Sequence, residues 1–209
     1  MNSLIGVIDY KAGNAPSVLN ALHTLNIESC LISSANAIQS VTGIILPGVG
    51  SAKATMDSLK ELKLLQAMER KVLVEKVPFL GICVGLQVLF EYSEEGSTIC
   101  LGWLKGNVKR FDSRERIPQM GWNQTDFVQT HPLIDGLNTQ EYFYFVNSYY
   151  VVPEEPGIVM AKTQYGIEFC SMVGYNNIFA SQFHIEKSGV VGLQLLKNFA
   201  LITRSESKC

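Results

Sequence analysis

The sequence lacks an excess of charge of either sign. Its 17 basic and 19 acidic residues leave a formal net charge of −2. A protein that binds nucleic acid usually carries a basic face, and one that binds an anionic membrane surface needs a basic patch as well. We therefore expect neither nucleic acid nor a membrane among its partners.

Cysteine and histidine are also few, and long apolar runs are missing. The five cysteines are odd in number and scattered without paired spacing, and the three histidines form no cluster at metal-site spacing. No uncharged apolar run approaches the ~20 residues of a membrane span, and the first residues lead into a strand pattern rather than a secretory leader. We expect reduced thiols in a cytoplasmic protein, with no metal and no cofactor.

The composition that remains is that of an ordinary globular protein. Hydrophobic residues make up 47% and charged residues 17% of the 209 residues, which suffices for one good-sized core and argues against disorder. No internal repeat, low-complexity segment or long linker divides the sequence. We expect a single domain over residues 1–209.

Strands and helices alternate in the first half. Continuous apolar runs predict buried strands over residues 4–8, 29–32, 43–46 and 79–82. Pro16 suits the first turn of a helix, Ser51 can cap another, and apolar residues at helical spacing continue to about Lys76. This alternation predicts an α/β fold with a mostly parallel central sheet flanked by helices, of the flavodoxin-like kind.

The second half of the sequence has a different residue pattern. Short aromatic and β-branched runs, separated by turn residues, predict antiparallel strands over 101–103, 107–111, 119–122, 142–150, 158–163, 168–173 and 178–183. These strands either extend the same sheet or form a small second one. A last helix is expected from Ser188 onward.

The stretch around Cys83 organises the chain. Gly81 and Gly85 flank Cys83 at minus and plus two, which is the spacing of a nucleophile elbow with Cys where hydrolases place Ser. Small residues are needed there because a side chain would collide with the neighbouring strand or helix. The helix that follows aims backbone N–H groups at Cys83 and offers donors to an oxyanion. The alternative is a buried structural cysteine in a parallel-sheet core.

A second informative stretch holds His184 and Glu186. In extended geometry the two side chains project to one face, with Ile185 pointing away. His184 can take the Cys83 proton, and Glu186 can fix the imidazole tautomer. Such a pair taken alone is usually a surface hydrogen bond, but beside a cysteine elbow it favours a Cys-His-Glu triad.

Two more regions have open interpretations. The glycine-rich loop 47–50 follows a strand. Its backbone N–H groups either form an oxyanion hole, or the loop is a plain turn without a role in catalysis. In parallel sheets the site lies beyond the carboxyl ends of the strands, where we expect loops 9–14 and 47–50 and Cys83 to meet. The aromatic-polar stretches 120–123 and 145–150 are either core strands or a pocket and docking surface.

Together these stretches resemble class I, triad-type glutamine amidotransferases. Among these, the sequence is most similar to the glutaminase subunits of imidazole glycerol phosphate synthase, over nearly its whole length. The motifs that carry the resemblance are L-P-G-V-G at 46–50, G-I-C-V-G-L-Q at 81–87, M-G-W-N at 120–123, F-V-N-S-Y-Y at 145–150 and Q-F-H-I-E-K-S at 182–188.

The resemblance implies an activity and a partner. Cys83 attacks the glutamine amide, His184 is the acid and base, and Glu186 orients His184. Glutamate and ammonia result, without a cofactor, and ammonia passes to a (β/α)8-barrel cyclase in a heterodimer that makes imidazole glycerol phosphate and an aminoimidazole carboxamide ribotide for histidine biosynthesis. The implied contacts to glutamine and its oxyanion are Gly48, Val49, Gly50, Val84, Gln87, Ser148 and Tyr149, and the implied partner interface includes Asn14, Trp122, Tyr144 and Lys187.

Four positions depart from the family pattern. Lys11 stands where glycine is usual, Ile185 replaces the proline between His184 and Glu186, and Asn147 and Gln119 stand where histidine is common. None removes a member of the triad. The departures leave room for a paralogue that delivers ammonia to another synthase, such as a sugar amidotransferase. A non-catalytic regulatory module and a thiol hydrolase of peptides are the remaining alternatives.

Overall fold

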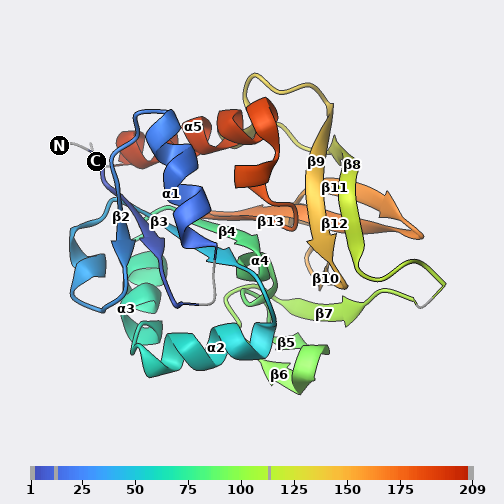
Figure 1. Ribbon diagram of the computed structural model, residues 1–209, viewed down its shortest axis with the longest axis horizontal. Coiled ribbons are helices and arrows are strands. Elements are labelled where there is room, and N and C mark those ends of the chain that lie inside the picture. The colour runs from blue at the N-terminus through green and yellow to red at the C-terminus, as the bar shows by residue number, and fades with distance from the viewer. Residues whose placement is uncertain (1–2, 12–13, 113, 207–209) are drawn as a thin grey trace.

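One mixed sheet organises the described residues, 3–11, 14–112 and 114–206, in this computed structural model (Figure 1). Its parallel half contains, in spatial order, β2 (Ser29–Ile32), β1 (Ile5–Ile8), β3 (Gly43–Gly48), β4 (Phe79–Cys83) and β13 (Ile178–Ser181). These strands are buried on both faces except for part of the edge strand β2. The predicted α/β class and the predicted strands of the first half are confirmed.

The second half of the sequence extends this same sheet. The sheet continues through β12 (Ile167–Tyr175), β10 (Tyr149–Pro153), β7 (Gly106–Arg110), β5 (Tyr92–Ser93) and β6 (Thr98–Ile99). A branch leaves β12 through β11 (Val159–Tyr165), β8 (Gln119–Phe127) and β9 (Gln140–Asn147). All these pairs are antiparallel except β5 with β7. The antiparallel strand pairing predicted for the second half is therefore confirmed.

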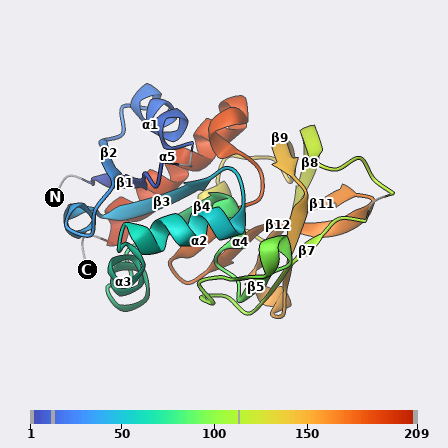
Figure 2. The same ribbon diagram turned by 60° about the horizontal axis from the view of Figure 1, so that its bottom comes forward.

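Helices cover both faces of the parallel half, as Figure 2 shows. On one face lie α1 (Ala15–Thr24) and α5 (Gly189–Glu206); on the other lie α2 (Ala52–Glu61), α3 (Leu65–Glu69) with its π-helical continuation Arg70–Val74, and α4 (Val84–Gln87). Short 3₁₀ turns are Ala37–Ser40, Glu95–Ser97, Pro132–Ile134, Pro156–Ile158 and Ile185–Lys187. Within the described residues, no helix is both long and apolar enough to span a membrane.

The helix starts follow the local sequence signals. Pro16 lies in the first turn of α1, where its missing N–H is not needed. The Ser51 hydroxyl caps α2 by accepting a hydrogen bond from the Ala54 N–H at 3.2 Å. Both predicted signals are confirmed.

Three details of the predicted elements are wrong. Residues 101–103 form no strand, because the N–H groups of Leu101 and Gly102 donate to the carbonyls of Val88 and Phe90 instead of a neighbouring strand. The run 142–150 is two strands, interrupted at Ser148. The helix after Cys83 is a single turn that ends at Gln87.

Candidate active site

Cys83 lies on a strained turn between β4 and α4. Its φ of 56° and ψ of −106° are unusual for a residue with a side chain. A Cβ on Gly85 would lie 2.1 Å from the Leu46 carbonyl oxygen, and one on Gly81 would lie 2.5 Å from the Gly85 carbonyl oxygen. The two glycines therefore permit the close backbone approach that a nucleophile elbow requires.

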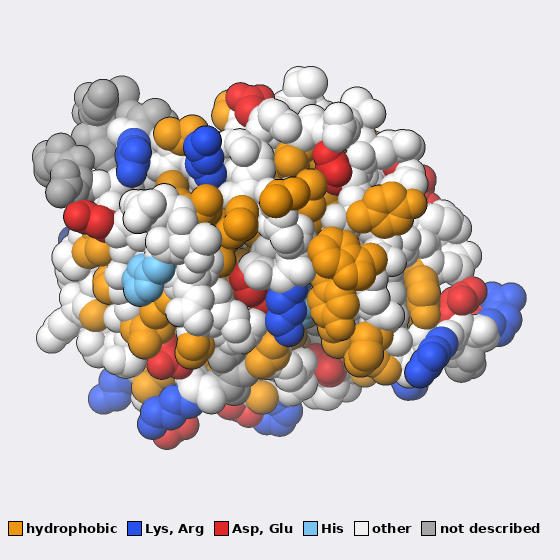
Figure 3. Space-filling view, turned by 45° about the horizontal axis from the view of Figure 1, so that its top comes forward, with side chains coloured by type: hydrophobic (Ala, Val, Ile, Leu, Met, Phe, Trp, Pro, Cys, Tyr) orange, Lys and Arg blue, Asp and Glu red, His pale blue; other side chains and the backbone are white. Residues whose placement is uncertain are grey.

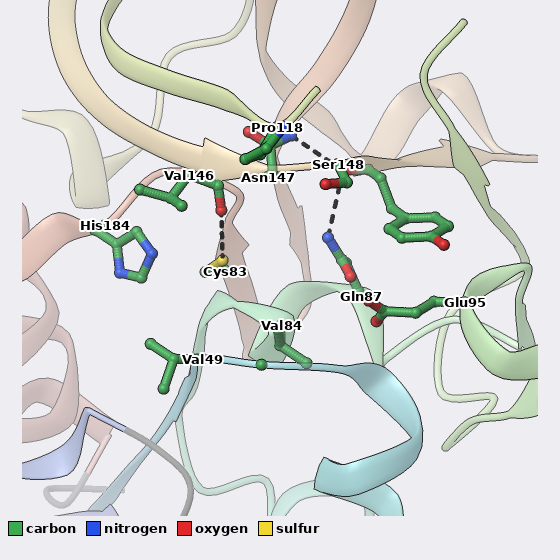
Figure 4. Close-up of a pocket in the computed structure, with 12 residues that line it drawn as sticks. Val49, Cys83, Val84, Gln87, Glu95, Pro118, Val146, Asn147, Ser148 and His184 are labelled. Atoms are coloured by element: carbon green, nitrogen blue, oxygen red, sulfur yellow. Dashed lines mark hydrogen bonds between the residues drawn. The ribbon is translucent and has the colours of Figure 1, made fainter. Parts of the chain in front are cut away.

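Two groups form hydrogen bonds with the Cys83 sulfur, and the His184 side chain lies near it. The sulfur lies 3.8 Å from the Val146 carbonyl oxygen, which accepts its S–H, and the Gln182 Nε2 donates to it at 3.7 Å. His184 lines the same cavity, and its interaction with the nearby Cys83 raises the pKa of the imidazole. Figure 4 shows Cys83, Val146 and His184 together at one end of a cavity. The sulfur is thus positioned both for proton transfer and for attack on a molecule in this cavity.

His184 and Glu186 form a buried pair. The His184 Nδ1 lies 2.9 Å from the Glu186 Oε1, and the two side chains are 3% and 1% exposed. The extended geometry expected for this pair is wrong, since Ile185–Lys187 is a 3₁₀ turn. His184 itself has an extended backbone just before this turn, and the turn still places the carboxylate against the imidazole.

Asn14 contacts the same carboxylate. Its Nδ2 donates to the Glu186 Oε1 at 2.9 Å, while its Oδ1 accepts from the Ser17 hydroxyl at 2.6 Å. The family resemblance implied a partner interface for Asn14, and this bond was not expected from the sequence. Asn14 therefore links the start of α1 to the His184–Glu186 pair.

The protonation states follow from these contacts. Burial disfavours a charge on His184, but the nearby Cys83 and the hydrogen-bonded Glu186 outweigh burial and raise the pKa of His184 to about 10. Burial also raises the pKa of Glu186, but hydrogen bonds from His184 and Asn14 outweigh it and lower that pKa below its usual value. An imidazolium beside a carboxylate results, which suits His184 to donate a proton to a leaving group.

Most of the residues predicted for glutamine and its oxyanion line this cavity. Its volume is about 230 Å³, below the ~300–1,000 Å³ typical of sites for drug-sized ligands, so it suits a molecule of amino-acid size. Val49, Gly50, Val84, Gln87, Ser148 and Tyr149 line it together with Cys83 and His184. Gly48 does not line it but pairs with Cys83 in the sheet.

Glu95 also lines the cavity and was missed in the sequence (Figure 4). Its carboxylate accepts a hydrogen bond from the Ala52 N–H at 2.7 Å, and burial raises its pKa. It stands at the end of the cavity away from His184, beside Gln87. No motif marks Glu95 in the sequence, because its place depends on the packing of a loop against the start of α2.

Val84 and Val49 both line the cavity around Cys83. Val84 begins α4, so its N–H has no acceptor within that helix and lies next to the nucleophile. Val49 lies near the buried Tyr10 hydroxyl, whose pKa burial raises to about 12. Val84 is therefore placed to donate to an oxyanion.

Strand β9 connects this cavity to an exposed surface. The Val146 carbonyl contacts the Cys83 sulfur, and the Tyr144 carbonyl accepts a hydrogen bond from the His184 backbone N–H at 2.9 Å. Trp122 pairs with Tyr144 across β8 and β9. Their rings pack edge to face, with 6.1 Å between the ring centroids. Trp122 is 56% exposed and Lys187 is exposed as well.

This surface is apolar at its centre. Figure 3 shows hydrophobic side chains gathered on this side of the molecule, with a basic side chain beside them. We define the docking surface as Met120, Trp122, Tyr142, Tyr144, Lys187 and Val190. The start of α5 adjoins it, since a Cβ on Gly189 would lie 4.0 Å from the Trp122 ring.

The departures from the family pattern have distinct surroundings. Lys11 adopts a φ of 66° and its N–H donates to the Asp9 carboxylate at 3.0 Å, so the position where glycine is usual is a left-handed one. Asn147 lines the cavity and donates to the Tyr149 carbonyl at 3.0 Å. Gln119 lies opposite Asn147, and its buried amide has no hydrogen-bond partner in the described part of the chain. Ala12 and Gly13, in the predicted rim loop, lie outside the described residues.

The other described cysteines do not share this chemistry. Burial raises the pKa of Cys100 to about 11 and that of Cys170 to about 12. Cys30 is partly exposed, and no described group of His, Cys, Asp and Glu side chains could hold a metal ion. Among the described cysteines, only Cys83 lines the cavity beside an imidazole.

We expect Glu186→Gln to lower kcat for reactions at Cys83 by about 10²–10⁴-fold, because an amide neither stabilises the imidazolium nor fixes the His184 tautomer. Steady-state rates of the purified variant measure this effect. Glu168→Gln, which alters an exposed carboxylate paired with Lys162, is the matched control. Equal kcat values for Glu186→Gln and the parent would exclude Glu186 from the triad.

Known proteins resemble this chain over nearly its full length. A family model described as "Glutamine amidotransferase class-I" matches residues 6–203. A Dehalococcoides mccartyi protein named "Imidazole glycerol phosphate synthase subunit HisH" is 47% identical over 206 residues, which cover 98% of this chain and all of that protein. A Methanocaldococcus jannaschii protein of the same name is 45% identical over 197 residues, covering 94% of this chain and 98% of the relative.

Solved structures support the same fold at low sequence identity. The structure of PurLQS from Thermotoga maritima matches with a TM-score of 0.78 and 18% identity, over 97% of this chain and 99% of that chain. The glutaminase domain of a Trypanosoma brucei CTPS, solved with bound acivicin, matches with a TM-score of 0.65 and 15% identity, over 95% of this chain and 94% of that chain. At these identities the likeness concerns the fold alone.

Proposed function

This chain belongs to the class I glutamine amidotransferase family, and we propose that it is the glutaminase subunit of an imidazole glycerol phosphate synthase, with Cys83, His184 and Glu186 as its triad. It hydrolyses L-glutamine to glutamate and ammonia and supplies the ammonia for a step of histidine biosynthesis. The observation that carries the triad is that Cys83 and a buried, hydrogen-bonded His184–Glu186 pair lie together at one end of a small cavity.

The first half of the reaction forms a thioester. The Cys83 thiolate adds to the side-chain amide carbon of glutamine, and the Val84 N–H stabilises the oxyanion. The His184 imidazolium gives its proton to the departing nitrogen, the C–N bond breaks and ammonia leaves. Neutral His184 remains beside a glutamyl thioester.

The second half regenerates the enzyme. His184 takes a proton from water, the oxygen adds to the thioester carbon, and the C–S bond breaks to release glutamic acid and the thiolate. The acid then gives its proton to ammonia in solution. The balance is one glutamine and one water consumed for one glutamate and one ammonium.

The cavity suits the rest of the glutamine molecule. The Glu95 carboxylate, at the end away from His184, is placed to accept the α-ammonium group, and Gln87, Ser148 and Tyr149 lie around the same end. Val49 lines the cavity beside Cys83 and is placed to supply a second oxyanion donor. We expect low turnover of the isolated chain, because a glutaminase without its partner would release ammonia that no synthase uses.

The partner is a cyclase barrel that binds the docking surface in a heterodimer. Exposed aromatic and aliphatic side chains with one lysine at the rim have the composition of a protein interface. The same face of β9 leads from Tyr142 through Tyr144 to Val146, which lines the cavity. Ammonia released at Cys83 therefore has only a short distance to travel to a partner that binds the docking surface.

We expect Trp122→Ala to weaken binding of the cyclase by about 30-fold or more, since a large aromatic side chain at an interface centre typically contributes about 2 kcal/mol. Isothermal titration calorimetry measures the dissociation constant. Tyr175→Ala is the matched control, because this 45% exposed aromatic lies near the opposite, amino ends of the parallel strands. Equal losses of affinity in both variants would contradict the docking surface.

The test of the function is glutamine-dependent ammonia release. The purified chain is assayed alone, and then with the histidine-pathway cyclase from the same organism, with and without the ribulosyl intermediate that the cyclase aminates. Strong stimulation with formation of imidazole glycerol phosphate is the expected result. No stimulation of a chain whose Cys83 still reacts with a glutamine-analogue inhibitor would contradict the pathway and indicate another ammonia acceptor.

A further inference from the structure

Gln182 is a fully buried amide placed directly against the Cys83 sulfur. It follows the last residue of β13, and its backbone N–H donates to the Ser171 carbonyl at 2.9 Å. Strand β13 lies parallel to β4, with Ser181 paired to Ile82. Residue 182 therefore lies beside Cys83, although 99 positions separate them in the sequence.

The hydrogen-bond network fixes which end of the Gln182 amide faces the sulfur. The Gln87 nitrogen donates to the Tyr149 carbonyl at 3.3 Å, and a carbonyl can only accept. The same nitrogen donates to the Gln182 Oε1 at 3.1 Å. The oxygen of Gln182 is thereby placed towards Gln87, so its NH₂ group is the end that faces Cys83.

The two neutral contacts of the sulfur favour opposite protonation states. The Val146 carbonyl accepts a hydrogen bond and so favours the thiol, whereas the Gln182 amide donates one and so favours the thiolate. A donor to an anion is especially effective in a buried site, where water competes little. An amide also keeps its protons at any pH at which the protein is folded, unlike the imidazole.

We propose that Gln182 is a positioning residue of the active site, whose amide N–H stabilises the Cys83 thiolate and holds the sulfur towards the cavity. This inference rests on the proposed function in that Cys83 is taken as the nucleophile. The amide stabilises the thiolate before attack and again when the C–S bond of the thioester breaks. It exchanges no proton, so the reaction balance is unchanged.

The test is the pH dependence of Cys83 alkylation by iodoacetamide, followed by mass spectrometry of the Cys83 peptide. Gln182→Met keeps the length of the side chain and removes the donor. We expect the midpoint of the alkylation rate to rise by about one pH unit, and kcat for glutamine to fall about tenfold with little change in KM. Gln182→Glu, which places an acceptor there, raises the midpoint further.

Other titratable groups around the sulfur stay the same in these variants. His184 lines the cavity beside the sulfur, Tyr10 is near enough to interact with it electrostatically, and Glu95 lies at the other end of the cavity. Gln119→Met is the matched control, because it removes an equally buried amide whose polar atoms have no partner among the described residues. We expect this control to leave the alkylation midpoint and kcat at the parent values.

An unchanged alkylation midpoint in folded Gln182→Met overturns the proposal. If thermal unfolding shows that neither Gln182 variant folds, Gln87→Met replaces them, since it removes the donor that orients the Gln182 amide. A smaller rise of the midpoint supports the proposal there, and no rise overturns it. Iodoacetamide needs no substrate site, so this series tests Gln182 even where glutamine hydrolysis is absent and the proposed function fails.

Discussion

Cys83→Ala is expected to abolish glutamine hydrolysis, lowering kcat by about 10³-fold or more, because no other described group in the cavity can form the thioester. Binding of the proposed cyclase partner should stay within about twofold of the parent, since the buried thiol is not part of the docking surface. Ammonia release and calorimetric titration with the cyclase measure the two quantities separately.

Cys170→Ala is the matched control for this prediction. Cys170 is also buried, but its sulfur donates to the Met172 carbonyl at 3.5 Å and burial raises its pKa to about 12. We expect Cys170→Ala to retain glutamine hydrolysis. Retained turnover in Cys83→Ala would remove Cys83 as the nucleophile, whatever the control shows.

Gly85→Ala is expected to lower the free energy of unfolding of the whole protein by about 3 kcal/mol. The added methyl group would lie 2.1 Å from the Leu46 carbonyl oxygen, a backbone atom of the central strand β3 that cannot move without disturbing the sheet. Equilibrium urea unfolding measures the loss, and ammonia release should fall with it.

Gly157→Ala tests whether the effect is specific to the elbow. A Cβ at Gly157 would meet nothing within 4 Å, so we expect a change in the free energy of unfolding of less than about 1 kcal/mol. If Gly85→Ala unfolded at the same urea concentration as the parent, the close approach of the elbow to β3 would be wrong.

The sequence predicted the parts of the fold that depend on local pattern. Buried parallel strands are continuous apolar runs, and the glycines around Cys83 mark a turn that only small neighbours allow. Residues 101–103 have the same apolar and aromatic character, but their N–H groups find acceptors at Val88 and Phe90. Local propensity could not predict this outcome, because a tertiary hydrogen bond decided it.

The site was predicted where a motif marks it and missed where only the fold assembles it. His184 and Glu186 were paired from their spacing, although a 3₁₀ turn rather than an extended strand brings them together. Glu95 reaches the cavity through the packing of distant segments. Gln182 stands in the motif at 182–188, but its contact with the Cys83 sulfur was missed. The topology contained one signal for Gln182, since strands that end side by side place their following residues together.

Strand β9 has a consequence for how this protein can evolve or be redesigned. Its Tyr144 and Val146 carbonyls contact His184 and Cys83, while Tyr144 also presents its side chain at the docking surface. A new partner cannot be accommodated by reshaping the β9 backbone without altering the reactivity of both residues. Selection for a different partner should therefore change side chains on β8 and at the start of α5 and leave the course of β9 untouched.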